Sequence, residues 1–175
     1  MTTTETGYHI LFVGFMGAGK STIARKLGRM FDRRVIDLDR LIERRAGKKV
    51  SRIFADEGEG GFRCREHAAL ESMLDETPCM VSCGGGVVTN PDNIGLLHRL
   101  GTVVYLQVDP DAAVRRISRP ETRPLLSGAR SPSDILAERL PAYEAAADVT
   151  VDTTGKSIEE VTNEVGELLW KRGLL

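Results

Sequence analysis

The stretch ILFVGFMGAGKSTIARKL, residues 10–27, joins an apolar run to a glycine-rich loop and then to an amphipathic pattern. The run from Ile10 to Val13 predicts a buried strand, and the pattern from Thr22 onward predicts a helix. Between them, Gly14 to Ser21 matches G-x-x-x-x-G-K-S/T, the phosphate-binding loop. The preceding strand and the following helix are the context in which this motif is specific, so we expect phosphate to be held here. A glycine-rich turn without a ligand is the alternative.

The residue types in this loop suit a bound nucleotide. Glycines at positions 14, 17 and 19 permit the positive φ angles and the close backbone approach that a phosphate needs. Lys20 adds a positive charge at the outer phosphates, and Ser21 places a hydroxyl where Mg²⁺ would bind. The motif predicts ATP or GTP with Mg²⁺ and leaves the phosphate acceptor open. The predicted nucleotide-binding residues of the loop are Gly17, Ala18, Gly19, Lys20, Ser21 and Thr22.

Short apolar runs alternate with longer helical patterns along the rest of the chain. This alternation predicts a parallel sheet, and because the runs are apolar throughout, helices should cover both of its faces. We therefore expect one domain over residues 1–175, a three-layer α/β/α fold with a five-stranded parallel sheet. The predicted strands are residues 9–13, 33–39, 79–83, 102–108 and 148–152.

Composition narrows the classes of partner. Lys and Arg total 24 against 25 Asp and Glu, so no overall field favours nucleic acid or an anionic membrane. The start, Met1 to Thr6, is polar, and no apolar stretch approaches about 20 residues, the length of a membrane span. A soluble, cytoplasmic protein is expected. The cysteines at 64, 83 and 79 lack zinc-ligand spacing and are expected to be reduced structural thiols.

Two aspartates, Asp37 and Asp39, close the second predicted strand. With a period of two they share one face at its carboxyl end, where ligands of open parallel sheets bind. One carboxylate would hold the metal through water, and the other would accept a proton from an attacking hydroxyl. For Asp39 alone, capping of a helix that begins near Arg40 is the alternative.

Two arginines fall on the apolar faces of predicted helices. Arg63 lies in the apolar stripe of residues 59–74, and Arg139 in that of residues 133–147. A pair between Arg63 and Glu66, which shares its stripe, is one explanation, since a buried charge must find a partner. The other is that both arginines receive one anion, because guanidinium groups match carboxylate or phosphate in a bidentate way.

Two further segments interrupt the regular pattern. Gly84 to Gly86 follow the third predicted strand and put bare backbone where a small ligand would sit, with a flexible turn as the alternative. Residues 119–133, RPETRPLLSGARSPS, predict a mobile lid. Its Arg119 and Arg123 would swing onto the transferring phosphoryl group and exclude water, whereas solvated loop charges are the plainer explanation.

Taken together, the motifs resemble the shikimate kinase family over about residues 10–152. The resemblance implies a nucleoside-monophosphate-kinase-like fold with sheet order 2-3-1-4-5. It also implies transfer of the ATP γ-phosphoryl group to the 3-hydroxyl of shikimate, with Mg²⁺, in aromatic amino-acid biosynthesis. Shikimate carries a carboxylate and hydroxyls, which fits an anionic alcohol as acceptor. The matching segments are GFMGAGKS (14–21), DLD (37–39), IFADEGEGGFRCRE (53–66), SCGGGVV (82–88), RPLL (123–126) and AERLPAYEAAADVTV (137–151).

On the substrate side, the resemblance assigns roles over about residues 37–66 and beyond. Asp39 would bind the hydroxyl that attacks, and Asp37 would assist Mg²⁺ through water. Arg63 and Arg139 would clamp the carboxylate, while the backbone of the glycine run contacts the hydroxyls. The predicted substrate-binding residues are Asp39, Arg63, Gly84, Gly85, Gly86 and Arg139, and the metal ligands are Ser21 and Asp37.

On the ATP side, the resemblance makes Arg123 the lid arginine on the phosphates and stacks Arg116 on adenine. Lys156 matches an ATP-contacting position more loosely. Lys20, Asp39 and Arg123 are the expected catalytic residues. The family also implies a monomer whose partners are shikimate and ATP, with neither nucleic acid nor membrane.

Two other classes of protein compete with this interpretation. Another small-molecule P-loop kinase, such as a gluconate kinase, shares the phosphate loop and lid but is not expected to combine DLD, GFR and GGG. A kinase-like chain that binds ligand without turnover would normally lack Lys20, Asp39 or Arg123, and all three are present. A nucleic-acid-acting P-loop ATPase is disfavoured by chain length, charge balance and the arginines on apolar faces.

Overall fold

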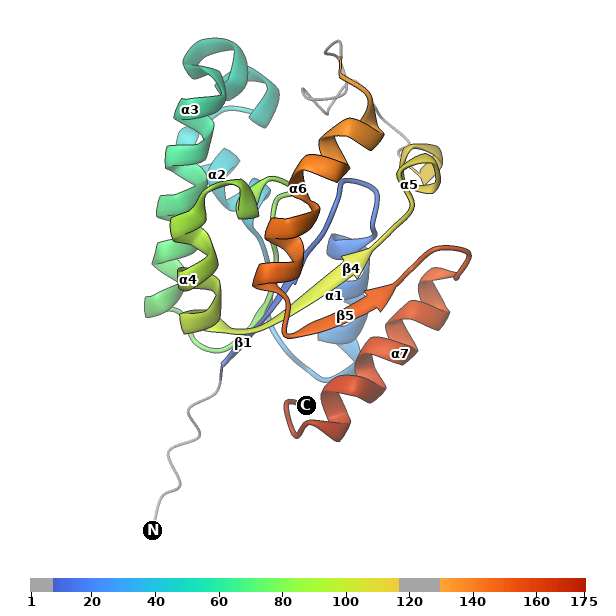
Figure 1. Ribbon diagram of the computed structural model, residues 1–175. Coiled ribbons are helices and arrows are strands. Elements are labelled where there is room, and N and C mark those ends of the chain that lie inside the picture. The colour runs from blue at the N-terminus through green and yellow to red at the C-terminus, as the bar shows by residue number, and fades with distance from the viewer. Residues whose placement is uncertain (1–7, 117–129) are drawn as a thin grey trace.

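A parallel five-stranded sheet forms the centre of the protein in a computed structural model that describes residues 8–116 and 130–175. The strand order is β2-β3-β1-β4-β5, which confirms the order that the family resemblance implied (Figure 1). β1 is buried at every position, as an apolar central strand should be. The strands are β1 (His9–Val13), β2 (Val35–Asp37), β3 (Met80–Ser82), β4 (Gly101–Gln107) and β5 (Val149–Asp152).

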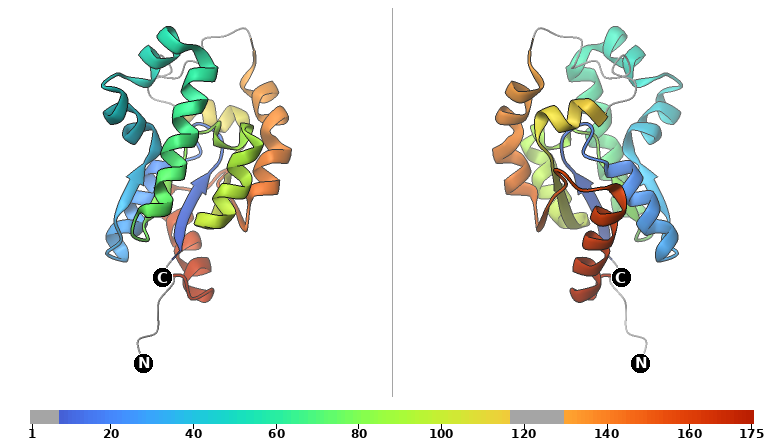
Figure 2. Two further views of the ribbon diagram at one scale, coloured as in Figure 1. Left: turned by 90° about the vertical axis from the view of Figure 1, so that its left-hand side faces the viewer. Right: turned by 90° about the vertical axis from the view of Figure 1, so that its right-hand side faces the viewer.

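Helices cover both faces of the sheet, so the predicted three-layer α/β/α arrangement is confirmed (Figures 1 and 2). One face is covered by α1 (Lys20–Met30) and α7 (Ile158–Lys171). The other is covered by α3 (Val50–Glu71), α4 (Pro91–Leu100) and α6 (Pro132–Ala146). The remaining elements are α2 (Leu38–Ala46), α5 (Pro110–Arg116) and the 3₁₀ turns η1 (Ser72–Asp75) and η2 (Val87–Thr89).

The strand register brings three carboxyl ends together. Ser82 of β3 pairs with Phe12 of β1 and with Asp37 of β2. The chain leaves β1 into the phosphate loop one residue after Phe12. Because parallel strands end at the same edge, the loop, Asp37 and the residues after β3 share one edge of the sheet.

The second strand is shorter than predicted, which corrects the placement of its aspartates. β2 ends at Asp37, and α2 starts at Leu38. The Asp37 carboxylate accepts a hydrogen bond from the backbone N–H of Arg40 at 3.2 Å and caps the helix. Asp39 therefore lies in the first turn of α2 rather than on a strand, and the helix-capping alternative considered for Asp39 belongs to Asp37.

The helix that carries Arg63 is longer than predicted. α3 begins at Val50 and is broken at Gly58, where φ is 70° and ψ is −178°, so the helix predicted from Glu59 is its second half. Leu74, expected on the buried face, lies beyond the helix in η1 and is 43% exposed. No helix in the part of the chain that the structure describes is long and apolar enough to cross a membrane.

Candidate active site

The phosphate loop has the strained backbone that its glycines predict. Gly14, Gly17 and Gly19 have φ angles of 144°, 79° and 91°, a region that side-chain-bearing residues rarely adopt. A Cβ on Gly14 would lie 2.5 Å from the carbonyl oxygen of Leu106. Gly19 is the N-cap of α1 and has no side chain to occupy the first N–H groups of the helix. Those groups are therefore oriented for an anion, as is the positive end of the helix dipole.

The lysine of the loop folds back over it. Lys20 is the first residue of α1 and is only 9% exposed. Its Nζ donates to the carbonyl oxygens of Gly14 at 2.8 Å and Phe15 at 3.0 Å. These two bonds keep the ammonium group at the centre of the loop, where phosphate oxygens would meet it. Thr22 follows on the same turn and donates its backbone N–H to Gly19 at 3.1 Å.

Hard oxygen donors gather beside the loop. Ser21 Oγ donates to Asp37 Oδ2 at 2.7 Å and lies 2.9 Å from Ser82 Oγ. The structure thus brings together the two predicted metal ligands and adds a third oxygen. Oxygen ligands suit Mg²⁺, which keeps several waters and is commonly shared with substrate phosphates. No group of three or more His, Cys, Asp or Glu side chains that could hold a metal occurs among the described residues.

Ser82 was not predicted as a site residue, although its place in the sequence carries a signal. Ser82 is the last residue of β3, a polar side chain that is only 3% exposed at the end of an apolar strand. Its register partner is Asp37. A polar residue at the carboxyl end of a central parallel strand points to the ligand edge of the sheet.

The glycine turn, residues 84–86, is where the predicted substrate residues meet. A Cβ on Gly84 would lie 2.7 Å from Glu66 Oε1 and 3.0 Å from Asp39 Oδ1. One on Gly85 would lie 3.4 Å from the backbone nitrogen of Met16, in the phosphate loop, and 3.9 Å from Arg139 Nη1. At Gly86 an added Cβ would collide with the guanidinium group of Arg63. At Gly84 and Gly86 a side chain would meet charged groups at less than ordinary contact distance, whereas a Cβ on Gly85 would make only ordinary contacts with the phosphate loop and Arg139.

Arg63 forms the structural pair that the sequence allowed. Its Nη1 donates to Glu66 Oε2 at 2.7 Å, and its Nη2 lies 3.1 Å from Glu59 Oε1. Glu66 has no exposed surface. Burial raises the pKa of Glu66, an effect that the charge of Arg63 only partly offsets. Burial by itself lowers the pKa of Arg63, but the charge of Glu66 and their hydrogen bond outweigh it, so the net shift is upward.

This pair does not exhaust the hydrogen-bonding capacity of its members. Arg63 Nε and Glu66 Oε1 are buried and have no hydrogen-bond partner within the described part of the chain. Buried polar atoms in this condition are costly unless something else satisfies them. Pairing with Glu66 and reception of an anion are therefore compatible functions of Arg63.

Arg139 has a different kind of hydrogen-bond partner from Arg63. It lies on α6, is 7% exposed, and its Nη1 donates to the carbonyl oxygen of Gly85 at 3.2 Å. This partner is neutral, whereas Arg63 has a carboxylate. The hydroxyl of Tyr143, one turn further along α6, donates to the same carbonyl oxygen. Sequence reasoning placed Tyr143 only on the apolar face, although its spacing of four from Arg139 puts both side chains on one face.

Arg116 and Lys156, the residues expected near the nucleotide base, lie together beyond β5. Arg116 donates to the backbone carbonyl and side-chain oxygens of Thr153 at 2.8 and 3.1 Å, and to the Lys156 carbonyl at 3.4 Å. The Lys156 ammonium pairs with Glu164 at 2.6 Å. Arg123 lies outside the described residues, as does the predicted lid over residues 119–129. The end of the predicted lid belongs to α6, which Ser131 caps.

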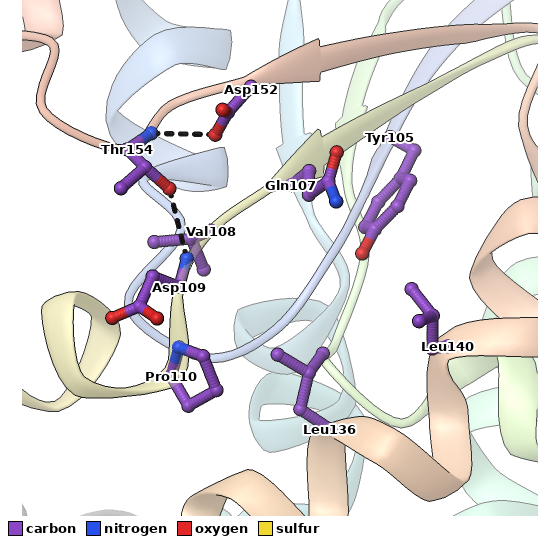
Figure 3. Close-up of a pocket in the computed structure, with 9 residues that line it drawn as sticks. All are labelled: Tyr105, Gln107, Val108, Asp109, Pro110, Leu136, Leu140, Asp152 and Thr154. Atoms are coloured by element: carbon purple, nitrogen blue, oxygen red, sulfur yellow. Dashed lines mark hydrogen bonds between the residues drawn. The ribbon is translucent and has the colours of Figure 1, made fainter.

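A separate cavity of about 260 Å³ lies between β4 and α6 (Figure 3). Its lining includes Tyr105, Leu136 and Asp152, and none of the predicted site residues. The candidate active site is therefore the convergence around the glycine turn and the phosphate loop, and not this cavity.

Comparisons with known proteins, by sequence and by structure, all point to one family. A family model described as shikimate kinase matches residues 16–170. The shikimate kinase of Dehalococcoides mccartyi is 38% identical over 169 residues, which is 95% of this chain and 96% of that protein. That of Vibrio parahaemolyticus is 40% identical and covers 94% and 97% of the two chains. The solved shikimate kinase of Acinetobacter baumannii in complex with shikimate has a TM-score of 0.90 and 33% identity, covering 98% of this chain and 97% of that one.

Proposed function

The chain belongs to the shikimate kinase family and is an ATP-dependent kinase of shikimate in aromatic biosynthesis, and we propose that it phosphorylates the 3-hydroxyl through the site around the glycine turn. The observation that carries this assignment of the site is the position of that turn. It touches the phosphate loop, Asp39, Arg63 and Arg139 at once. A small acid bound against it would have its donor phosphate, its proton acceptor and its carboxylate partners within reach.

The donor half holds ATP. The backbone of Gly17, Ala18 and Gly19, together with the first turn of α1 from Lys20 to Thr22, surrounds the β- and γ-phosphates, and Lys20 moves from its carbonyl partners onto them. Ser21 and Asp37 would hold Mg²⁺, directly or through water, and Ser82 supports the Ser21 hydroxyl. A bound Mg²⁺ neutralises charge on the phosphates. Arg116 and Lys156 contact the nucleotide at the base end, and Arg123 approaches the phosphates from the lid.

The acceptor half orients shikimate. Arg63 and Arg139 bind the ring carboxylate, since guanidinium groups match carboxylates in a bidentate way. The glycine backbone contacts the ring hydroxyls. Asp39 accepts the proton of the 3-hydroxyl as its oxygen bonds to the γ-phosphorus and the bond to ADP breaks. Phosphoryl transfer demands chiefly alignment and charge neutralisation, which these groups supply.

The proposal extends to the oligomeric state, the location and the partners of the protein. It works as a monomer in the cytoplasm, without nucleic-acid or membrane partners. The near-equal numbers of basic and acidic residues support the lack of nucleic-acid and membrane partners, because they give no overall field toward an anionic polymer or surface.

A coupled ADP-release assay with shikimate, quinate, gluconate and nucleoside monophosphates tests the assignment. Shikimate should be the preferred acceptor, and activity should require a divalent cation, with Mg²⁺ compared against Ca²⁺ and no metal. Preference for gluconate or any other acceptor would overturn it. The product is checked by phosphorus NMR, because a phosphate on another hydroxyl would contradict the proposed geometry.

A further inference from the structure

One carbonyl oxygen in the glycine turn accepts two hydrogen bonds from α6. The oxygen of Gly85 receives the hydroxyl of Tyr143 and, at 3.2 Å, Nη1 of Arg139. A carbonyl has two lone pairs, so these two donors satisfy it completely. The two donors differ in whether they also have to bind the substrate. Under the proposed function Arg139 has to present its guanidinium group to a carboxylate, whereas Tyr143, whose hydroxyl also hydrogen-bonds the Arg139 side chain, does not have to bind the substrate.

Tyr143 is built to stay where it is. The side chain has no exposed surface, and its ring stacks on that of Tyr105 with centroids 5.1 Å apart and an interplanar angle of 11°. Burial raises the pKa of Tyr143 to about 12, so the hydroxyl keeps its proton and remains a donor at neutral pH. A stacked, buried ring loses little freedom when it makes one further hydrogen bond.

The position of Gly85 explains why its carbonyl needs a fixed donor. An added Cβ there would lie 3.4 Å from the backbone nitrogen of Met16 and 3.6 Å from the carbonyl oxygen of Gly14. The turn is thus the spacer between α6 and the phosphate loop. A shift of Gly85 would alter the distance between the acceptor and donor halves directly.

We propose that Tyr143 is a positioning residue, which anchors the Gly85 carbonyl so that Arg139 can leave it for the substrate carboxylate without releasing the glycine turn. The proposal rests on the proposed function, because it assumes that a carboxylate recruits Arg139. Without the Tyr143 hydroxyl, one guanidinium group must serve both the carbonyl and the carboxylate. Either the substrate carboxylate or the buried carbonyl oxygen of Gly85 then lacks a good hydrogen bond, so shikimate binds more weakly.

A nearby tyrosine supplies a matched control. Tyr105 is the other member of the stack, and Figure 3 shows its hydroxyl pointing into the cavity between β4 and α6, with no hydrogen bond drawn to it. Tyr143→Phe and Tyr105→Phe each remove one hydroxyl from the same pair of stacked rings. Only the first removes a bond to the glycine turn.

The test compares KM and kcat of the wild type and the two variants with shikimate and with its methyl ester, which has no carboxylate charge. Tyr143→Phe should raise KM for shikimate roughly tenfold, the size expected for an unsatisfied buried carbonyl. KM for ATP and kcat should change less than twofold, and KM for the ester should stay close to that of the wild type. Tyr105→Phe should leave all these values within twofold.

Three results would overturn the inference while leaving the proposed function intact. One is an equal effect of both variants on an active enzyme, and another is an equal rise in KM for shikimate and its ester, as general loosening would give. The third needs no variant: in the wild type, hydrogen exchange at the amides around Gly85 should stay slow when shikimate saturates the enzyme, and faster exchange contradicts the anchor. A wild type inactive on shikimate would instead overturn the proposed function, and the inference with it.

Discussion

The two halves of the site are built in opposite ways. The centre of the donor half is one uninterrupted segment, Gly14–Ser21, whose shape is set by glycine backbone angles and by the strand and helix that it joins. The acceptor half is assembled from α2, α3, the glycine turn and α6, which are far apart in the sequence. Under the proposed function the first half would bind chiefly with backbone N–H groups, whereas the second would bind with side chains that contact one another. Affinity for ATP and affinity for the acceptor should therefore respond to different substitutions.

The hydrogen bonds of the charged groups show the same contrast. Lys20 rests on the carbonyl oxygens of its own loop. Arg63 pairs with Glu66 of its own helix and packs against Gly86 of the glycine turn, while Arg139 donates to Gly85 of the same turn. Substitutions in the acceptor half should consequently act through neighbours as well as directly. The contrast would fail if a substitution in one half changed the affinities for ATP and for shikimate equally.

The largest effect is expected for Asp39→Asn. The amide keeps the size of the carboxylate but cannot accept the proton of the attacking hydroxyl, so kcat should fall about 10²–10⁴-fold. ATP affinity should stay nearly unchanged, because Asp37 rather than Asp39 lies against Ser21. Asp134→Asn is the matched control, since both residues lie in the first turn of a helix. Steady-state ADP release and equilibrium ATP binding measure the two outcomes, and unchanged turnover would remove Asp39 from catalysis.

Arg139→Ala comes next. It removes a buried guanidinium group from the acceptor half, which should weaken shikimate binding by about 2–5 kcal/mol, and leave ATP binding within about twofold. Arg99→Ala, at an exposed position in the last turn of α4, should change neither. Isothermal titration with each ligand separates the two affinities. Equal losses for both ligands would contradict the carboxylate role.

A single methyl group tests the crowding of the glycine turn. In Gly86→Ala the new Cβ would collide with the Arg63 guanidinium group and displace it. Overpacking of this kind costs about 1–3 kcal/mol, so KM for shikimate should rise roughly tenfold. Gly95→Ala on α4 is the control, because nothing lies within 4 Å of a Cβ there. The same KM for both variants would mean that Arg63 can yield without consequence for the substrate.

The same contrast explains how much of the molecule could be predicted. The donor half is local, so the sequence pattern identifies the phosphate loop, its positive φ angles and its lysine. The fold followed from apolar runs and from the family resemblance, which carried the strand order. β2 ends two residues before the predicted end of the strand, because the Asp37 carboxylate caps α2. A period-two pattern does not show whether an aspartate continues a strand or caps the helix that follows.

What could not be predicted in the acceptor half are the pairings across space. The spacing of apolar residues predicts on which face of its helix Arg139 lies. It does not predict that Tyr143 donates a hydrogen bond to a carbonyl 58 residues away. Ser82, in the donor half, was also missed: its polar side chain at the end of a strand was a signal, but its position beside Ser21 follows from the register of β3 against β1 and β2. Such contacts are decided by packing of whole elements, which local patterns do not encode.

The smallest predicted effect is at the edge of the donor half. Lys156 pairs with Glu164, and its carbonyl accepts from Arg116, so its ammonium group is already partly engaged and solvated. Lys156→Ala should raise KM for ATP by about two- to threefold at low salt, and less at high salt, because exposed charges interact weakly and are screened. Lys171→Ala is the control: it breaks a similar pair with Glu167 on the same helix α7, but at its far end. Both variants should lose the same small amount of thermal stability, so a change in KM for ATP that occurs only in Lys156→Ala is a contact with the nucleotide. Equal KM values would take Lys156 out of the ATP site and leave Arg116 as the proposed residue at the base.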